Sequence, residues 1–127
     1  AAEDAVKNMT DQGLERLRQI QAAQREDLSN YNVDEFIRHD REFHSCIYEM
    51  SLNRELMKLA SNYYDVFRFL GMQAVMGTEE RRLTTIEEHQ DILEAMEQHN
   101  PKAAVQAMKK HMEQTETNIR RHIKIAP

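Results

Sequence analysis

The sequence of 127 residues has few of the residues that break helices, cross-link chains or span membranes. It contains three glycines, two prolines, one cysteine and no tryptophan. The single thiol, Cys46, excludes an internal disulfide and a cysteine-based zinc site, so we interpret it as a small packing residue. Apolar runs are too short to cross a bilayer, and no segment resembles a signal peptide. These absences predict a cytoplasmic protein with no membrane segment.

The residues that are abundant favour one soluble domain. Apolar residues make up 40% of the chain and charged residues 31%, as in globular proteins, and the length fits a single domain over residues 1–127. The net charge of −5 argues against a nucleic-acid surface, because phosphate recognition needs clustered Lys and Arg. Positive charge gathers only in residues 102–124, where we interpret it as favourable placement near a helix C-terminus.

Helix-favouring residues and capping patterns predict an all-α protein. The end of one helix covers residues 1–8, and Thr10 or Asp11 begins a second helix that runs to about residue 28. Asn32 and Glu35 have the spacing of a capping box, in which each side chain bonds the other residue's backbone N–H. This pair predicts the start of a third helix, which runs to about residue 50.

The second half of the chain predicts three further helices. A long helix follows residue 53 and ends at Gly77. Thr85 and Glu88 repeat the capping-box spacing and predict the start of a helix that ends at His99. Asn100 precedes a proline, a pairing that favours a helix start, and this last helix runs to about residue 124. We therefore expect an antiparallel bundle of about six helices with short loops.

Asp40 and His44 lie in an apolar stripe of the helix predicted for residues 33–50. The stripe consists of apolar residues that recur at helical spacing, namely Phe36, Ile37, Phe43 and Ile47. Residues four apart are neighbours on a helix surface, so both polar side chains should face the core side by side and can hold a common ion. A buried hydrogen bond between them is the alternative, but a buried carboxylate needs a cation or donors.

Two further histidines are predicted to point inward from the last two helices. His89 falls among Ile86, Leu93 and Met96, and His111 falls between two methionines of the final helix. Each histidine is eleven residues from Asn100, at the centre of the intervening turn. Equal distances from the turn mean equal height in an antiparallel hairpin, so the two imidazoles should meet.

Together these residues predict a metal site with one carboxylate and three histidines: Asp40, His44, His89 and His111. Nitrogen and oxygen donors without thiolate suit Zn²⁺, our first choice, and also Ni²⁺, Mn²⁺, Fe²⁺ or Co²⁺. Four ligands can close a structural tetrahedron or leave two positions of an octahedron open. The other three histidines (His39, His99 and His122) are interpreted as solvent-side or loop residues without a role.

Three stretches carry a resemblance to a known family: "NMTDQGLERLRQI", "DEFIRHDREFHSCIYEMSLNREL" and "EEHQDILEAMEQHNPKAAVQAMKKHM". They resemble the FCD domain, the C-terminal effector-binding domain of the FadR subfamily of GntR-type bacterial transcription regulators. In metal-containing members the corresponding Asp and three His bind a divalent ion, which agrees with the four residues above. The family normally carries an N-terminal winged helix-turn-helix, absent from this sequence, so we expect DNA to be read only by that attached domain.

The resemblance also implies a small carboxylate effector and a regulator that acts as a homodimer. A divalent ion with one Asp leaves a net positive charge that attracts an anion. Arg68 is a candidate partner for a second carboxylate, with a surface-directed arginine as the alternative. Asn118 lies two turns beyond His111 and can line the pocket or simply occupy the bundle seam. A metal-stapled structural or dimerisation module remains a second hypothesis, and a metal-dependent enzyme a third, although no acid or base is aimed at the ion.

Overall fold

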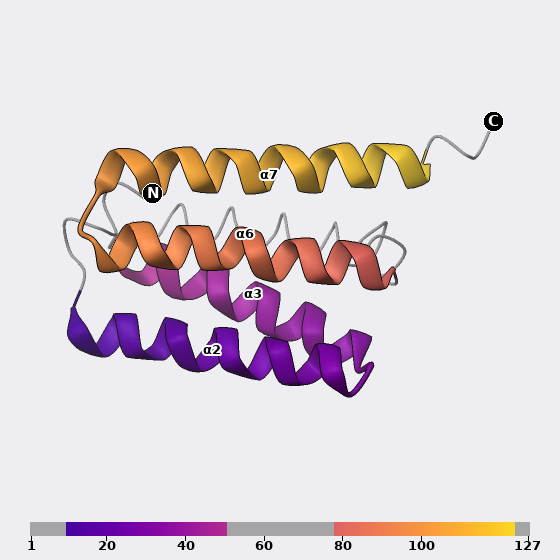
Figure 1. Cartoon of the computed structure of the whole chain (residues 1–127), viewed down its shortest axis with the longest axis horizontal. Coiled ribbons are helices and arrows are strands. Elements are labelled where there is room, and N and C mark those ends of the chain that lie inside the picture. The colour runs from indigo at the N-terminus through magenta and orange to yellow at the C-terminus, as the bar shows by residue number, and fades with distance from the viewer. Residues whose placement is uncertain (1–9, 51–77, 124–127) are drawn as a thin grey trace.

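The computed structural model describes residues 10–50 and 78–123, which form four α-helices and, within those ranges, no strand. The helices are α2 (Asp11–Ser29), α3 (Val33–Met50), α6 (Glu79–Glu97) and α7 (Pro101–Ile123). Figure 1 shows two antiparallel hairpins, α2 with α3 and α6 with α7, and α2 also packs against α6. The all-α prediction is confirmed for this part. The helices predicted within residues 1–8 and 53–77 lie outside it, so the count of six stays a prediction.

Three helices begin where their capping residues predict. Thr10 Oγ1 accepts a hydrogen bond of 3.0 Å from the backbone N–H three residues ahead. Asn32 Oδ1 accepts the equivalent bond at 3.2 Å, and Asn100 Oδ1 does so at 3.1 Å. Each bond satisfies one of the N–H groups that the first turn of a helix leaves without an intrahelical partner. Side-chain caps therefore fix the starts of α2, α3 and α7.

The two described turns are built alike. Tyr31 and His99 both have positive φ, 54° and 52°, the left-handed conformation that commonly ends a helix. The next residue in each turn donates its backbone N–H back to the helix that is ending, Asn32 to the Asp27 carbonyl at 2.9 Å and Asn100 to the Ala95 carbonyl at 3.0 Å. These same asparagines cap the next helix, so each hairpin has a short, defined connection.

The predicted start of α6 is wrong. The helix begins at Glu79 rather than at Thr85, and Thr78 is its cap, with Oγ1 accepting from the Arg81 N–H at 3.3 Å. Thr85 is instead buried inside the helix. A Thr and a Glu three residues apart share a face within any helix, so the spacing alone does not mark a start. The acidic pair after Thr78 fits a helix N-terminus better, because negative charge there is favourable.

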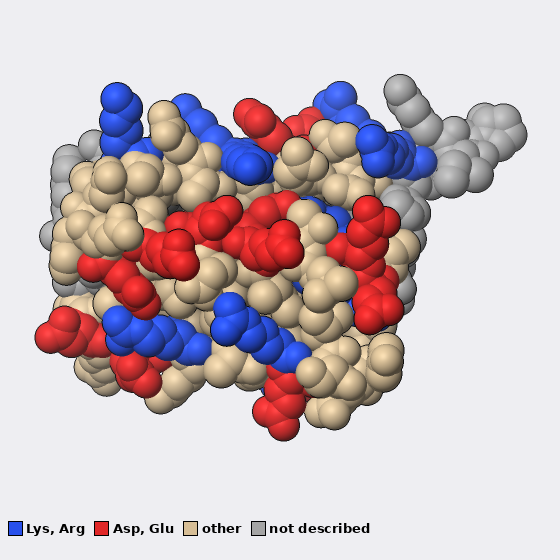
Figure 2. Space-filling view, viewed as in Figure 1, with Lys and Arg blue, Asp and Glu red and all other residues tan. Residues whose placement is uncertain are grey.

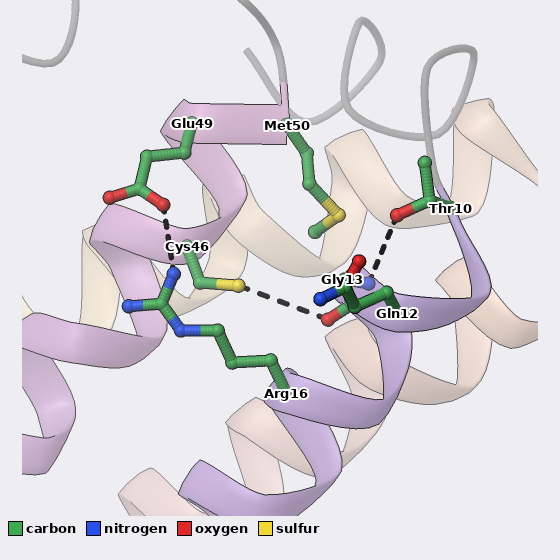
Figure 3. Close-up of a pocket in the computed structure, with 7 residues that line it drawn as sticks. All are labelled: Thr10, Gln12, Gly13, Arg16, Cys46, Glu49 and Met50. Carbon is green, nitrogen blue, oxygen red and sulfur yellow. Dashed lines mark hydrogen bonds and ion pairs between the residues drawn. The ribbon is translucent and has the colours of Figure 1, made fainter.

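The core lies where the four described helices face one another. It consists of apolar side chains that are almost fully buried: Leu14, Leu17, Ile20, Phe43, Cys46, Ile47, Ile92, Leu93, Ala95, Met96 and Ala104. Cys46 is one of these packing residues, as predicted, and burial raises the pKa of its thiol. Figure 3 shows its sulfur directed at the Gly13 carbonyl, 3.9 Å away, beside a cavity of about 310 Å³ between α2 and α3.

The surface carries charges of both signs in separate bands. Figure 2 shows acidic residues across the middle of one face, over α6, with basic residues above on α7 and below on α2. Arg18 of α2 bridges to Glu97 of α6 at 3.0 Å. Exposed pairs of this kind contribute little to stability, so the buried side chains decide the fold. No helix in residues 10–50 or 78–123 is long and apolar enough to cross a membrane.

We expect Leu17→Ala to lower the free energy of unfolding by about 2–5 kcal/mol, because the side chain is 0% exposed and its removal leaves a cavity. Leu83→Ala is the matched control, since Leu83 is 48% exposed on α6, and it should change stability by less than about 0.5 kcal/mol. Urea unfolding followed by circular dichroism measures both. Equal losses from the two variants would contradict this core assignment.

Candidate metal centre

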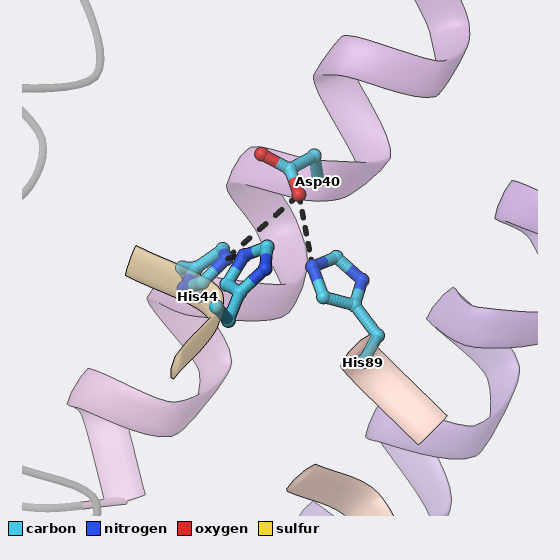
Figure 4. A group of neighbouring side chains, drawn as sticks. Asp40, His44 and His89 are labelled. Atoms are coloured by element: carbon cyan, nitrogen blue, oxygen red, sulfur yellow. Dashed lines mark hydrogen bonds and ion pairs between the residues drawn. The ribbon is translucent and has the colours of Figure 1, made fainter. Parts of the chain in front are cut away.

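Three helices bring four ionisable side chains to one point in the core. Asp40 and His44 come from successive turns of α3, His89 from α6 and His111 from α7. All four are at most 1% exposed. Figure 4 shows Asp40 and His44 on one face of α3, with His89 reaching them from the opposite helix. The predicted meeting of His89 and His111 is confirmed, with ring centroids 4.8 Å apart.

The spacing of the polar atoms suits a single metal ion. Asp40 Oδ1 lies 3.0 Å from His89 Nε2 and 3.8 Å from His44 Nε2. The Nε2 atoms of His44 and His111 are 2.9 Å apart, and all four residues offer a donor atom to the same cluster. Ligands about 2.1 Å from one ion stand about 3 Å apart at right angles and about 4.2 Å apart when opposite. The cluster can therefore hold a metal ion.

Gln24 fixes the tautomer of His89. The Gln24 amide donates its Nε2–H to the Phe36 carbonyl at 3.3 Å, so its Oε1 faces His89 Nδ1 at 2.9 Å. An amide oxygen only accepts hydrogen bonds, and His89 Nδ1 must therefore carry the proton. The lone pair of neutral His89 is then on Nε2, 3.0 Å from the Asp40 carboxylate. Two such acceptors repel one another unless a cation lies between them.

Glu88 fixes the tautomer of His111 in the same way. Its Oε1 accepts the His111 Nδ1–H at 2.7 Å, and in the neutral ring this leaves the lone pair on Nε2, directed at the cluster. Arg81 holds Glu88 with two hydrogen bonds of 2.9 and 3.0 Å. Outer partners of this kind are the usual companions of metal-binding histidines. The arrangement presents two imidazoles as lone-pair donors toward Asp40 and His44.

Burial and the neighbouring charges set the protonation of the cluster. Burial lowers the pKa of His44 well below its ordinary value, and it lowers the pKa of His89 despite the opposing charge of Asp40. Burial alone would raise the pKa of Asp40, but the hydrogen bond that His89 donates when protonated and the positive charge of protonated histidines outweigh it and hold that pKa below the ordinary carboxyl value. These directions favour an ionised Asp40 beside neutral His44 and His89 near neutral pH. That state is the one a divalent cation needs.

Apolar packing closes the site on one side. The ring of Phe43 stacks on His89 with centroids 4.1 Å apart and an interplanar angle of 2°. It also meets His44 edge-on at 5.9 Å. Phe43 was predicted to be a packing residue, and the stack adds that it helps to hold the His89 ring in place. Polar atoms of the cluster are thereby kept away from bulk water on this side.

The two residues predicted to contact an effector have different outcomes. Arg68 lies outside the described residues. Asn118 is half-buried on α7, donates its Nδ2–H to the Gln114 carbonyl at 2.7 Å, and lines a cavity of about 390 Å³ between α6 and α7. Arg81 and Arg121 line the same cavity, together with Glu80. The polar lining is compatible with a role for Asn118, which stays a prediction.

One of the histidines predicted to be solvent-side is in fact mostly buried. His39 contacts the Asp27 carboxylate through Nδ1, and both side chains are only about one-eighth exposed. His99 is exposed in the turn before α7, as predicted. The reason for the difference is that α2 packs directly against α3 and covers the side of the helix on which His39 lies.

Sequence reasoning missed the three residues that orient the histidines: Gln24, Glu88 and Arg81. Gln24 gave a usable signal, because it continues the buried stripe of Leu17, Ile20 and Gln21 on α2, and a polar residue on such a stripe needs a partner. Glu88 was interpreted as a capping residue, and Arg81 was not singled out. Their roles depend on how closely α6 and α7 approach, which no pattern within one helix gives.

Comparison with protein families identifies the FCD domain. The model of the FCD domain family matches residues 1–114, a span that includes all four residues of the cluster and both described hairpins up to the middle of α7. The comparison with curated proteins found no match.

We expect the metal-free protein to lose stability as the pH falls from 7 to 5. The pKa values of His44 and His89 are lower in the folded chain than the ordinary value of about 6.5, so the unfolded chain binds more protons in this range. Each such proton contributes up to about 1.4 kcal/mol per pH unit. Urea unfolding with a chelator present measures the slope. His44→Gln should reduce it, and a flat profile for the unaltered protein would contradict the prediction.

Proposed function

The chain belongs to the FCD domain family, and from this premise we propose that it is the ligand-sensing domain of a GntR-type transcription regulator. Its metal site would consist of Asp40, His44, His89 and His111. The observation that carries the proposal is the set of lone pairs facing the Asp40 carboxylate. Gln24 and Glu88 accept the Nδ1 protons of His89 and His111, so the Nε2 lone pairs of the neutral rings face inward, where a cation would balance the buried carboxylate.

The choice of ion follows from the donors. Three imidazoles and a carboxylate suit Zn²⁺, our first choice, and also Ni²⁺, Mn²⁺, Fe²⁺ or Co²⁺. A divalent ion, when bound, supplies Lewis-acid positions at which a carboxylate can replace water. The charge of Asp40 then leaves the centre at +1, because Arg81 offsets the charge of Glu88. A small organic anion is therefore the class of effector that this chain favours.

We assign Asn118 to the far end of such an effector, with Arg68 as a second contact. Asn118 borders the polar cavity between α6 and α7, next to Arg81 and Arg121. An amide and guanidinium groups are suitable partners for a carboxylate or hydroxyl group. In this proposal the effector changes the packing of the bundle, and a homodimer transmits the change to attached winged-helix domains.

Two other functions receive less support. A purely structural metal site is favoured by one observation, the nearly complete burial of all four side chains, and it predicts no response to added acids. An enzyme needs an acid or base near the reacting group. The neighbouring carboxylates are already engaged, Glu88 by Arg81 and His111, and Glu42 by Arg38 at 2.5 Å.

We expect purified protein to bind about one divalent ion per chain, and His44→Ala and His111→Ala to lose the same ion although 67 residues separate them. Each removed ligand should weaken binding by more than about a hundredfold, beyond the range of changes that act only on ligand orientation. Elemental analysis after dialysis and competition with a chelator measure both quantities. His99→Asn is the control, since asparagine tolerates the positive φ of that turn. Unchanged metal content in either alanine variant would overturn the ligand assignment.

The effector step is tested by titrating a panel of mono- and dicarboxylic acids into metal-loaded and metal-free protein. An acid that binds at the metal should raise the melting temperature of the loaded protein alone. At a hundredfold excess over Kd the stabilisation is about 2.7 kcal/mol. Asn118→Ala should weaken that response while leaving metal content unchanged. If no acid shifts the loaded protein, the structural-module hypothesis is favoured instead.

A further inference from the structure

A buried ion pair on α6 lies directly behind the metal centre. Arg81 and Glu88 are seven residues apart and only 4% and 6% exposed. Their two parallel hydrogen bonds of 2.9 and 3.0 Å form the forked geometry typical of arginine and carboxylate. A buried pair of this kind often adds less stability than apolar residues of the same size would. Its position behind a candidate metal ligand therefore calls for another explanation.

Both members of the pair contact the helical turn that carries His111. Glu88 Oε1 accepts the His111 Nδ1–H at 2.7 Å. Arg81 Nη2 donates to Thr115 Oγ1 at 3.0 Å, and that hydroxyl donates to the His111 carbonyl at 2.9 Å. The ring and the backbone of His111 are thus held from α6 by one connected set of hydrogen bonds. Within the described residues, Glu88 is the hydrogen-bond partner of His111 Nδ1.

The partner of His89 is different in kind. Gln24 offers a neutral amide oxygen at 2.9 Å, whereas Glu88 offers a carboxylate at 2.7 Å. A carboxylate behind an imidazole orients the ring and increases its strength as a ligand more than a neutral acceptor does. The two histidines of the α6–α7 hairpin therefore differ in how firmly Nδ1 is held. His111 has the stronger hydrogen-bond acceptor.

We propose that Glu88, held in place by Arg81, is the positioning residue that makes His111 a metal ligand. It fixes the Nδ1–H tautomer, so that Nε2 points into the cluster, and it keeps the ring at the height of His44 on α3. The inference rests on the proposed metal site. It adds that the affinity for the ion depends on the Arg81–Glu88 pair, although neither residue is a proposed ligand. Arg81 does not contact His111 itself but acts through Glu88 and Thr115, because it holds the Glu88 carboxylate and the Thr115 hydroxyl in place.

The test compares metal affinity in Glu88 variants with that of the unaltered protein. Glu88→Ala should weaken Co²⁺ and Zn²⁺ binding by about 10–100-fold. Glu88→Gln should recover part of this loss, because an amide oxygen still accepts the His111 proton. Glu87→Gln, an exposed neighbour on the same helix, is the matched control and should bind as the unaltered protein does. The visible absorption of bound Co²⁺ reports the ligand set directly, and it should change in Glu88→Ala but not in Glu87→Gln.

A double variant separates positioning from stability. Glu88→Ala leaves Arg81 buried without its partner and can unfold the chain, whereas Arg81→Met/Glu88→Leu removes both charges and should fold at least as stably as the unaltered protein. We expect this folded variant to bind metal at least tenfold more weakly. Wild-type affinity and an unchanged Co²⁺ spectrum in the double variant would overturn the inference. If the unaltered protein binds no metal, the proposed function itself fails, so the two failures are distinguishable.

Discussion

The structure depends on the carboxylate of Asp40, which is buried among three imidazoles. Asp40 would be expensive to place in the core unless its charge were balanced, and burial keeps the nearest histidines neutral rather than charged. The protons that the rings do carry on the far side are taken up by Gln24 and Glu88. When these rings are neutral, their Nε2 lone pairs face the cluster, and a cation at the centre would balance the Asp40 carboxylate.

The arrangement of helices brings the four side chains of the cluster together. The connection between α6 and α7 is short and capped at both sides, which sets His89 and His111 at equal height. α3 supplies two of the proposed ligands, Asp40 and His44, on one face, and α2 supplies Gln24 from behind. Figure 1 shows how α2 and α3 lie beside the α6–α7 hairpin. The proposed ligands come from both hairpins, so an ion bound there would cross-link the two halves of the described bundle.

Much of this could be predicted because it depends on local patterns. Asn32 and Asn100 mark helix starts by their own capping chemistry. Asp40 and His44 stand out on an apolar stripe. His89 and His111 are equally far from Asn100 along the chain, which predicts that their rings meet across the hairpin. The start of α6 was mispredicted because Thr85 and Glu88 satisfy the capping spacing inside a helix just as well. The roles of Gln24, Glu88 and Arg81 depend on contacts between helices, which the periodicity of a single helix does not contain.

The most direct measurement of the central claim is anomalous X-ray diffraction from crystals of the protein grown with Zn²⁺, recorded on both sides of the zinc absorption edge. We expect one peak per chain, within bonding distance of Asp40 Oδ1 and of the Nε2 atoms of His44, His89 and His111. A peak elsewhere on the surface, or none in the core with Asp40 hydrogen-bonded to a protonated His89, would contradict it.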